Sequence, residues 1–362
     1  MENVFVTDVG SHSIKYGTVR RAKRGNTTTF SGTQQSPTIV ENTCRSMDYD
    51  AADDANPFSC TSMGTFSQQM LQLLNGSPCN ASEYTLMLMI SPLATMRFKE
   101  LLVRAAFEEL AAKRVFIGYS ACLSLFGAGT TSGLVVDVGY HGTTICPVSN
   151  ATPAFPFVER IPHQGMASVD AAIASACASD ISFPPPAELM AKYSSTFLHS
   201  VKAECCSLAA GLRTPPTGSA LPTLTLPDGT ALRCPLSAEQ YVDCCRPLVE
   251  GTSLLFSVQQ AARNVIKNTP TWQSSYMLIG GGAALPGVES YFLEGLSCTP
   301  RVVFGTTKDL VHQQCRDPVT AAWTGASICA QLSIFPGMCM DREGYEESGP
   351  REALRYNMSD SR

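Results

Sequence analysis

One short pattern occurs twice in the 362 residues, and it constrains the fold more than any other feature. The segment Val6–His12 (VTDVGSH) aligns with Val135–His141 (VVDVGYH) at a constant separation of 129 residues, which Val19 and Val148 also keep. Each copy reads as a strand, an aspartate, a glycine turn and a second strand, which is the pattern of a β-hairpin. The chain is therefore predicted to consist of two related halves, each opening with a hairpin whose tip carries an acid and a glycine.

Segments typical of strands and helices alternate along the rest of the chain. Tyr84–Ile90 is apolar apart from Thr85 and ends at Ser-Pro, as a buried strand does, and apolar residues recur at helical spacing from Phe98 to Ala105 within residues 97–112. Further strands are predicted at 4–6, 14–19, 134–137 and 145–148, and further helices near 167–178, 187–212 and 238–267. Mixed strands and helices of this kind indicate an α/β protein.

Charge and hydropathy exclude two classes of partner. The net charge is −5, and only 16% of the residues are charged, against roughly 25% in ordinary soluble domains. A mildly acidic chain without a broad basic face is not expected to bind nucleic acid directly. The longest apolar run, Tyr84–Ile90, is too short to span a membrane, and the sequence opens with Met-Glu-Asn rather than an apolar signal segment. We therefore expect a soluble intracellular chain.

The fifteen cysteines do not change that expectation. They include two adjacent pairs, Cys205-Cys206 and Cys244-Cys245, but no C-x-x-C motif. Structural zinc sites use paired thiolates at short spacing, which this sequence lacks. We expect reduced thiols that pack in the core as small hydrophobic side chains.

The two hairpin tips have the chemistry of a phosphate site. A tight glycine turn exposes consecutive backbone N–H groups that can hold phosphate oxygens, and Asp8 and Asp137 could face a hydrated Mg²⁺. A third glycine cluster, Gly280–Gly282, follows a predicted buried strand and would let backbone approach a flat ligand closely. Each hairpin tip and the glycine cluster, taken singly, could also be an ordinary turn without a ligand.

Taken together, these segments resemble the actin family over nearly the whole chain. Asp8–Gly17 and Asp137–Pro147 resemble the two phosphate loops of actins, and Leu278–Gly287 is similar to their adenosine motif. The segments that separate actins from the wider sugar-kinase and Hsp70 superfamily are Leu226–Gly229, Trp323–Phe335 and Tyr345–Pro350. The resemblance implies an α/β fold of two similar actin-like domains, each a mixed β-sheet flanked by helices, with a nucleotide cleft between them.

The same resemblance implies domain boundaries. The first domain would comprise residues 1–127 and 319–362, with residues 37–65 as a shortened outer subdomain. The second would comprise residues 128–318, with residues 164–246 as its outer subdomain.

The resemblance also carries over a set of binding residues for ATP or ADP with Mg²⁺. Lys15 would reach the phosphates as a point charge, while Asp8 and Asp137 would face the Mg²⁺ through water. Gly165 and Lys202 match positions near the ribose and base. The phosphates would be lined by Gly10, Ser11 and Gly139, and the adenosine by Gly280, Gly281 and Gly282. Lys15 as a solvated strand residue and Lys202 as a helix-surface lysine are the alternatives.

Several residues depart from the actin pattern. His12 and His141 replace small residues at the two loop tips, where they could contact phosphate or narrow the cleft; a Cβ there also restricts the turn. Other departures near the expected ligand are Tyr140 in place of an aspartate, Ala203 in place of a glutamate, and Ala284-Leu285 in place of larger residues.

Two further departures concern hydrolysis. Ser120 stands where actins keep the glutamine that orients the attacking water, and Thr144 stands where they keep a histidine. Phosphoryl transfer to water depends on such a positioning residue. We expect slow or absent ATP hydrolysis and no residue with a clear catalytic role.

Polymerisation is also expected to be compromised. Only the 25 residues 41–65 separate Pro37–Val40 from the next recognisable element at Phe66, which is fewer than in actins. The segment Pro247–Tyr276, which resembles the region that carries the cross-strand plug of actin filaments, is also a few residues short. A helical polymer needs both faces of a heterologous interface to match.

The sequence therefore favours a structural subunit or cap within a larger cytoskeletal or motor-associated complex, with other subunits and actin itself as partners. A filament-forming ATPase and a subunit of a chromatin-remodelling complex are the alternatives, and a small-molecule kinase is a weaker one. The predicted location is the cytoplasm and cytoskeleton, including the axoneme. The nucleus stays open, because the only basic cluster, Arg20–Arg24, reads as a solvated turn.

Overall fold

The structure is a computed structural model of the chain. It describes residues 2–21, 36–42, 60–77, 84–178, 195–208, 223–225, 229, 231–233, 236–250, 254–268, 274–296, 302–303 and 317–351. The chain divides into two compact units. The first unit comprises residues 1–135, 146–158 and 307–362, and the second comprises residues 136–145 and 159–306.

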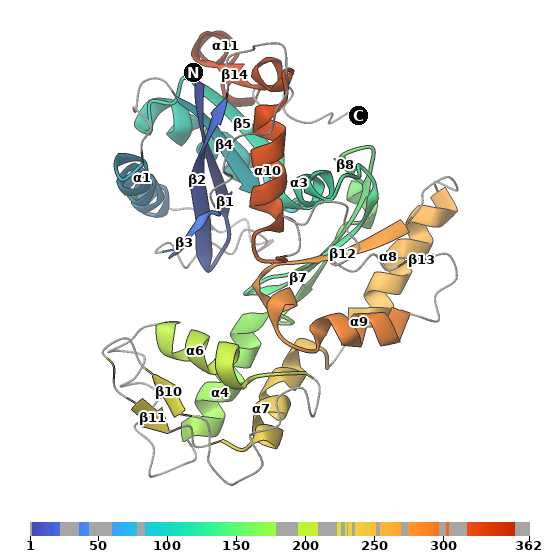
Figure 1. The fold of residues 1–362 in the computed structure, drawn as a ribbon. Coiled ribbons are helices and arrows are strands. Elements are labelled where there is room, and N and C mark those ends of the chain that lie inside the picture. The colour runs from blue at the N-terminus through green and yellow to red at the C-terminus, as the bar shows by residue number, and fades with distance from the viewer. Residues whose placement is uncertain are drawn as a thin grey trace. The chain divides into compact units, whose positions relative to one another are not determined.

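The first unit is built on a six-stranded mixed sheet in the order β14-β5-β4-β1-β2-β3 (Figure 1). Strand β1 pairs in parallel with β4, and β4 with β5, whereas the β1–β2, β2–β3 and β5–β14 pairs are antiparallel. The strands are β1 (Glu2–Val9), β2 (Ser13–Arg21), β3 (Thr38–Glu41), β4 (Tyr84–Ile90), β5 (Arg114–Tyr119) and β14 (Met340–Asp341). Because β1, β4 and β5 run the same way, their carboxyl ends meet at one edge of the sheet.

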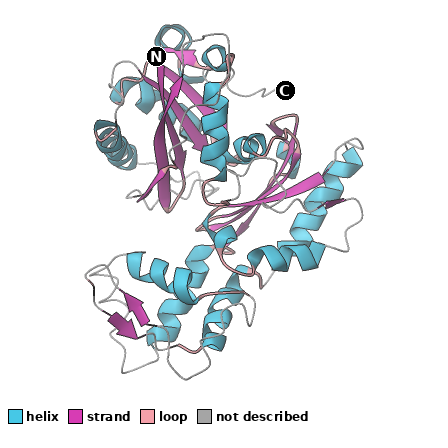
Figure 2. Cartoon of the chain, in the orientation of Figure 1, coloured by secondary structure: helices cyan, strands magenta, loops and turns pink. Residues whose placement is uncertain are grey.

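Helices cover this sheet (Figure 2). They are α1 (Cys60–Asn75), α2 (Met96–Arg104) with its π-helical continuation η1 (Ala105–Glu109), α3 (Ser120–Gly127), α10 (Ala321–Gln331), the 3₁₀ turn η6 (Phe335–Met338) and α11 (Arg342–Ser348). Trp323 of α10 anchors a buried cluster that includes Met87 and Phe335. Its indole N–H donates to the carbonyl oxygen of Val6 at 3.2 Å, and its ring lies directly against Gly17.

The second sheet has the order β13-β12-β6-β7-β8, with β9 also paired to β7. Its strands are β6 (Gly133–Val138), β7 (Gly142–Ser149), β8 (Thr152–Pro153), β9 (Glu159–Pro162), β12 (Ser274–Ile279) and β13 (Val302–Val303). A two-stranded sheet pairs β10 (Thr223–Thr225) with β11 (Ala231–Arg233). These two mixed sheets, each with helices, confirm the predicted α/β class.

The remaining helices follow β8 in the chain. The 3₁₀ turn η2 (Phe155–Phe157) is followed by α4 (Met166–Ala178), α6 (Ser195–Cys205), α7 (Ala238–Cys245), η3 (Arg246–Leu248), α8 (Leu254–Asn268), η4 (Gly281–Ala284) and α9 (Val288–Leu296). Among the described helices of both units, none is long and apolar enough to cross a membrane.

The duplicated hairpin is confirmed in atomic detail. β1 ends at Val9 and β2 begins at Ser13, while β6 ends at Val138 and β7 begins at Gly142, so both strand ends keep the separation of 129 residues. The turns also close in the same way. The N–H of Gly10 donates to the Ser13 carbonyl at 3.1 Å, and the N–H of Gly139 donates to the Gly142 carbonyl at 3.0 Å.

Three of the predicted helices have different bounds in the structure. The helix predicted over 97–112 changes at Ala105 into a π-helical turn, which Leu110 closes by donating to Ala105, and the chain then leaves with Ala111 at a φ of 51°. The helix predicted over 238–267 is interrupted after Cys245, because Pro247 has no N–H to continue the ladder. Helix α6 ends at Cys205 rather than Leu212, and the N–H of Leu208 bonds to Pro286 instead.

The short segment of the first unit also differs from expectation. Helix α1 begins at Cys60, so the element expected from Phe66 starts six residues earlier and takes in the end of residues 41–65. Residues 43–59, most of Leu226–Gly229 and Ala22–Arg24 lie outside the described residues.

The nine cysteines whose side chains the structure describes are all buried, as the sequence predicts, and none of these nine forms a disulfide. Burial raises the pKa of the Cys122 thiol to about 12 and that of Cys329 to about 11. Only the thiolate reacts with an alkylating agent, so a raised pKa removes the reactive form at pH 8.

We therefore expect Cys122 and Cys329 to resist iodoacetamide at pH 8 in the folded chain and to react at the rate of a free cysteine in urea. Peptide mass spectrometry after timed alkylation measures both rates. Equal rates with and without urea would contradict the burial of these thiols.

Candidate functional site

The first hairpin turn is held in place by one buried asparagine. Its tip, Gly10–His12, joins β1 to β2. The side-chain amide of Asn42 donates to the Gly10 carbonyl at 2.8 Å, and the backbone N–H of Asn42 donates to the His12 carbonyl at 2.9 Å. The turn carbonyls are thereby bound to Asn42, which is fully buried just after β3. No sequence pattern pointed to this residue.

Two charged side chains face each other at the base of the same hairpin. Asp8 and Lys15 are direct partners in the antiparallel β1–β2 register, which places their side chains on one face. The Lys15 Nζ and the Asp8 Oδ2 are 2.7 Å apart, and both side chains are about nine-tenths buried. Lys15 is therefore a buried, paired residue, and the alternative that it is a solvated strand residue is wrong.

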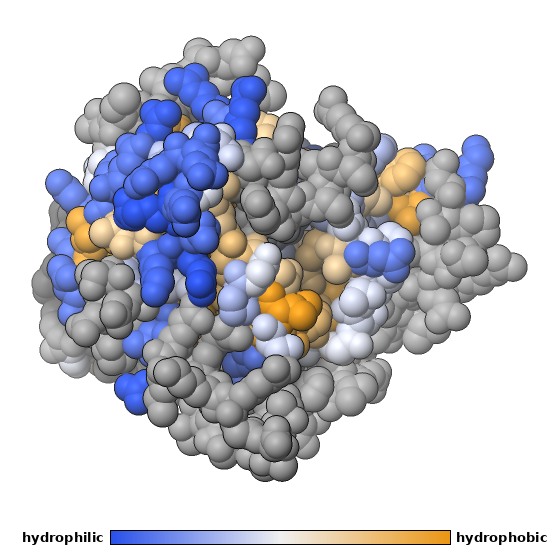
Figure 3. Space-filling model, turned by 90° about the horizontal axis from the view of Figure 1, so that it is seen from above, coloured by the Kyte–Doolittle hydropathy of each residue, from blue (hydrophilic) through white to orange (hydrophobic). Residues whose placement is uncertain are grey.

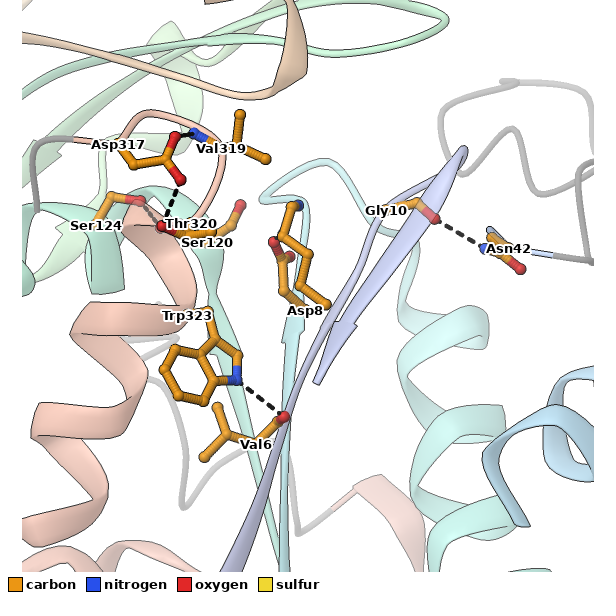
Figure 4. Close-up of polar contacts among 11 residues, drawn as sticks. Val6, Asp8, Gly10, Asn42, Ser120, Ser124, Asp317, Val319, Thr320 and Trp323 are labelled. Atoms are coloured by element: carbon orange, nitrogen blue, oxygen red, sulfur yellow. Dashed lines mark hydrogen bonds and ion pairs between the residues drawn. The ribbon is translucent and has the colours of Figure 1, made fainter. Parts of the chain in front are cut away.

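Ser120 lies near Asp8 at the same edge of the sheet. Asp8 pairs with Met89 and Met89 with Gly118 across the parallel strands, and Ser120 follows β5 as the first residue of α3. Figure 4 shows Asp8 beside Ser120, with Thr320 at the start of α10 close by. Thr320 donates its hydroxyl to the Asp317 carboxylate at 2.9 Å, and the Ser124 hydroxyl donates to the Ser120 carbonyl at 2.7 Å.

The second hairpin turn rests on the start of α4. The N–H groups of Met166 and Ala167 donate to the carbonyls of Gly139 and Tyr140 at 3.0 and 2.8 Å. This close approach requires Gly165, because a Cβ there would run into the Tyr140 carbonyl and the Gly142 N–H. His141 is bound through its carbonyl, which accepts from the N–H of His163 at 3.3 Å.

Lys202 belongs to a buried cluster in the second unit rather than to a solvated helix surface. Its Nζ lies 2.5 Å from the Asp170 Oδ1 of α4 and 5.8 Å from the centre of the Tyr140 ring. Tyr140 in turn packs edge-on against His141. Asp170, which sequence reasoning missed, thus links Lys202 on α6 with α4, which begins beside the second turn.

The glycine cluster after β12 packs on the second hairpin. Gly280 has a φ of 91°, and a Cβ on it would collide with the Asp137 carboxylate and the Val138 carbonyl. A Cβ on Gly282 would meet the Val138 side chain, whereas one on Gly281 would meet nothing within 4 Å. The structure therefore brings together, within the second unit, Asp137, the 139–142 turn, Gly165, Lys202 and Gly280–Gly282.

Most of the predicted site residues therefore gather within their own unit. Asp8, Gly10, Ser11, His12, Lys15 and Ser120 lie along one edge of the first sheet, and the others surround the second hairpin. Thr144 lies on β7, paired with Arg160 of β9. Ala203 is exposed on α6, and Ala284 and Leu285 follow the glycine cluster.

Among the described residues, no group of three or more His, Cys, Asp or Glu side chains could hold a metal ion. Mg²⁺ bound to a nucleotide keeps several waters and needs only one or two carboxylates, and Asp8 and Asp137 are the carboxylates beside the two turns. At Gly165 and Gly280, other atoms of the second unit occupy the place that a Cβ would take, so these two glycines allow close packing within that unit.

Comparison with known proteins gives matches to one family. Residues 60–209 match the family model described as Actin. Actin-like protein 7A of Rattus norvegicus is 25% identical over 288 residues, which is 74% of this chain and 60% of that protein. Actin-like protein 9 of Homo sapiens is 26% identical over 275 residues, which is 72% of this chain and 62% of that protein. The chain thus spans about 60% of the length of the curated relatives it matches.

The family match covers α1 through α6 and includes the second hairpin, and both relatives extend over most of the chain. The two mixed sheets with their helices fit the same fold. These matches and this fold support a divergent actin-related protein of the actin family.

Proposed function

We propose that this chain binds ATP or ADP with Mg²⁺ and acts as a structural subunit or cap of a cytoskeletal or motor-associated complex. The observation that carries the nucleotide proposal is the pair of matching turns. Each turn follows a strand that ends in Asp-Val, and in each the N–H of the first glycine donates the hydrogen bond that closes the turn. The N–H groups of Gly10 and Gly139 close the turns, and the backbone N–H groups that follow them, at Ser11-His12 and Tyr140-His141, would bind the phosphates. Lys15, which the Asp8 carboxylate holds at the base of the first turn, would add a positive charge.

The remaining parts of the ligand would contact the second unit. Asp8 and Asp137 would face the Mg²⁺ through its waters, as in the expectation from sequence. The ribose and base would lie on the open face of Gly281, near Gly165 and Lys202. Support for this comes from Gly281, whose side-chain position is open while both neighbouring glycines pack tightly.

We also propose that the bound nucleotide is hydrolysed slowly or not at all. Ser120 and Thr144 are short hydroxyl side chains at the positions where actins have a glutamine and a histidine. A serine hydroxyl reaches less far than a glutamine amide, so an attacking water beside Ser120 would be oriented less firmly. The nucleotide would then serve to stabilise the folded chain, since a ligand that binds only the native state raises its stability.

The structural role is supported by exposed apolar residues and by low charge. Among the described residues, the large apolar side chains at the surface are Ile39, Met96, Phe155, Phe256 and Ile334, and Ile334 is 65% exposed. Figure 3 shows apolar areas among the hydrophilic ones on the face it draws. Ile39 lies on β3, the last strand of its sheet. Apolar side chains of this kind, in a chain with 16% charged residues, fit a surface that is partly covered by partner subunits.

Replacing Lys15 with alanine tests the nucleotide proposal. A charge-assisted hydrogen bond to phosphate contributes roughly 1.5–3 kcal/mol, so the variant should bind ATP and ADP about 10- to 100-fold more weakly. Isothermal titration calorimetry with Mg²⁺ present measures this, and circular dichroism checks the fold. The exposed Lys113→Ala variant is the matched control and should bind normally. No binding by the wild-type chain at millimolar nucleotide would contradict the proposal.

Single-turnover hydrolysis beside a pelleting assay tests the remaining claims. We expect little phosphate release and no sedimenting polymer. Robust phosphate release together with sedimentation would favour a filament-forming ATPase instead. Proximity labelling followed by mass spectrometry is a separate test that identifies the partner complex. Exclusively chromatin-associated partners would contradict the cytoskeletal assignment.

A further inference from the structure

The two hairpin turns have equivalent carbonyl groups bound, although different parts of the chain bind them. In the first turn these are the carbonyls of Gly10 and His12, and in the second they are those of Gly139 and His141, 129 residues further on. Each of the four accepts a hydrogen bond from a donor outside its own hairpin. The duplicated turns are therefore held through the same atoms, which the geometry of a hairpin alone does not require.

In the second turn both donors are main-chain groups. The N–H of Met166, the first residue of α4, donates to the carbonyl of Gly139 at 3.0 Å, and the N–H of His163 donates to that of His141 at 3.3 Å. Every residue except proline carries a backbone N–H. No exchange of one side chain for another, short of proline, removes either donor.

In the first turn one residue supplies both donors. Asn42 donates from its side-chain amide to the carbonyl of Gly10 at 2.8 Å and from its backbone N–H to that of His12 at 2.9 Å. Asn42 is fully buried. The carbonyl of Gly10 is thus bound by a side chain, whereas its counterpart at Gly139 is bound by the main chain. A single substitution can therefore release the first turn and leave the second as it is.

The Asn42 side chain also decides where the next backbone N–H points. The carbonyl of Gly10 and the N–H of Ser11 belong to one peptide bond, and the described part of the chain contains no cis peptide bond, so the two groups point in opposite directions. In Figure 4 the Gly10 carbonyl points to Asn42, whereas Asp8 lies on the other side of Gly10. The N–H of Ser11 is therefore directed away from Asn42.

A glycine at this position leaves the peptide free to rotate unless another group holds it. Glycine adopts a wider range of φ and ψ than any other residue, so sterics alone do not fix the plane of the Gly10–Ser11 peptide. Turning its carbonyl away would deprive the buried Asn42 amide of this acceptor, which costs free energy. The hydrogen bond from Asn42 therefore keeps the peptide in one orientation.

We propose that Asn42 is a positioning residue for phosphate, which aims the N–H of Ser11 at an anionic oxygen of the nucleotide. This inference rests on the nucleotide binding proposed above and adds to it a residue that does not touch the ligand. With the amide in place, the N–H is oriented before the ligand arrives, so less conformational freedom is lost on binding. Without the amide, the peptide can turn its carbonyl toward the phosphate, which repels it.

The alternative is that Asn42 only secures the end of β3. Gln69 of α1 provides the comparison, because its buried side-chain amide donates to the carbonyl of Glu41, one residue before Asn42, at 2.7 Å. This hydrogen bond secures the same segment without involving the turn. Gln69→Met, which keeps the length of the side chain and removes the amide, is therefore the matched control. It should lower the melting temperature but leave nucleotide binding close to that of the wild type.

Hydrogen–deuterium exchange with and without Mg-ATP reads the two turns separately. In the wild-type chain Mg-ATP should slow exchange in peptides that cover residues 10–13 and residues 139–142. Asn42→Leu keeps nearly the same volume and the backbone N–H but has no side-chain donor. At saturating Mg-ATP this variant should lose the protection of the first turn and keep that of the second. Its affinity for ATP, measured by calorimetry, should fall about 10-fold.

The outcomes separate this inference from the proposed function. If the wild-type chain does not bind Mg-ATP, both fail. If it binds and Asn42→Leu keeps both its affinity and the protection of the first turn, only the role of Asn42 fails. Equal losses in Gln69→Met, or loss of protection at both turns in Asn42→Leu, would also overturn that role, since either indicates general loosening.

Circular dichroism shows whether Asn42→Leu folds, and Asn42→Ala takes its place if it does not. The wild-type chain supplies a further test that needs no variant. Protection of residues 139–142 by Mg-ATP without protection of residues 10–13 would overturn the inference, because the N–H of Ser11 would then not bind phosphate.

Discussion

Replacing Gly325 with valine is expected to unfold the first unit at room temperature. Gly325 lies in α10 where this helix crosses α3, and a Cβ there would run into the carbonyl of Leu123 and approach the N–H of Gly127 to 2.9 Å. These are backbone atoms, so the helices must separate to accommodate a side chain. Even alanine should cost about 3 kcal/mol or more, and valine more again.

Gly64 provides the control for this prediction. It is also a helical glycine, in α1, but a Cβ on it would meet nothing within 4 Å. Gly64→Ala should therefore stabilise the chain by roughly 0.5–1 kcal/mol, because alanine loses less backbone entropy. Urea unfolding followed by circular dichroism measures both changes. If Gly325→Ala and Gly64→Ala shift the urea midpoint of unfolding in the same direction, the prediction that α3 packs too closely on α10 for a side chain at residue 325 is wrong.

Replacing Gly280 with alanine should have the second large effect, in the second unit. The φ of 91° costs a non-glycine residue about 1–2 kcal/mol, and the Cβ would also collide with the Asp137 carboxylate and the Val138 carbonyl. We expect a total loss of about 3 kcal/mol in the free energy of unfolding and no measurable nucleotide binding, because Asp137 and the adjoining turn are displaced.

The adjacent Gly281→Ala variant separates folding from binding. Its Cβ meets nothing in the chain, so the free energy of unfolding should stay within about 0.5 kcal/mol of the wild-type value. If the adenosine lies on this open face, as we propose, nucleotide affinity should still fall. Thermal melting and calorimetry on the two variants give both quantities. Normal affinity in Gly281→Ala would move the proposed adenosine site away from this turn.

The two hairpins were predictable from sequence because their information is local. Each needs only an apolar strand, an aspartate and a glycine within about fifteen residues, and the duplication made each copy support the other. The structure reproduces the strand ends and the closing hydrogen bonds at the same separation. The break in the predicted 238–267 helix is also local information, since Pro247 cannot continue a helix whatever the periodicity of the apolar residues around it.

The residues that position the candidate site were not predictable in the same way. Asn42 reaches Gly10 across 32 residues, and Asp170 reaches Lys202 by joining two separate helices. Hydrogen bonds and ion pairs between distant segments leave no periodic pattern, since each partner is a single polar residue in its own stretch.

The sequence by itself determined the α/β class, the duplication and the resemblance to the actin family, because these rest on local strand, turn and glycine patterns. Only the tertiary structure decided that Lys15 and Lys202 are paired with aspartates, and that Gly165, Gly280 and Gly325 admit no side chain. The physical reason is that burial, steric contact and ion pairing depend on distances between atoms that the chain brings together only when it folds.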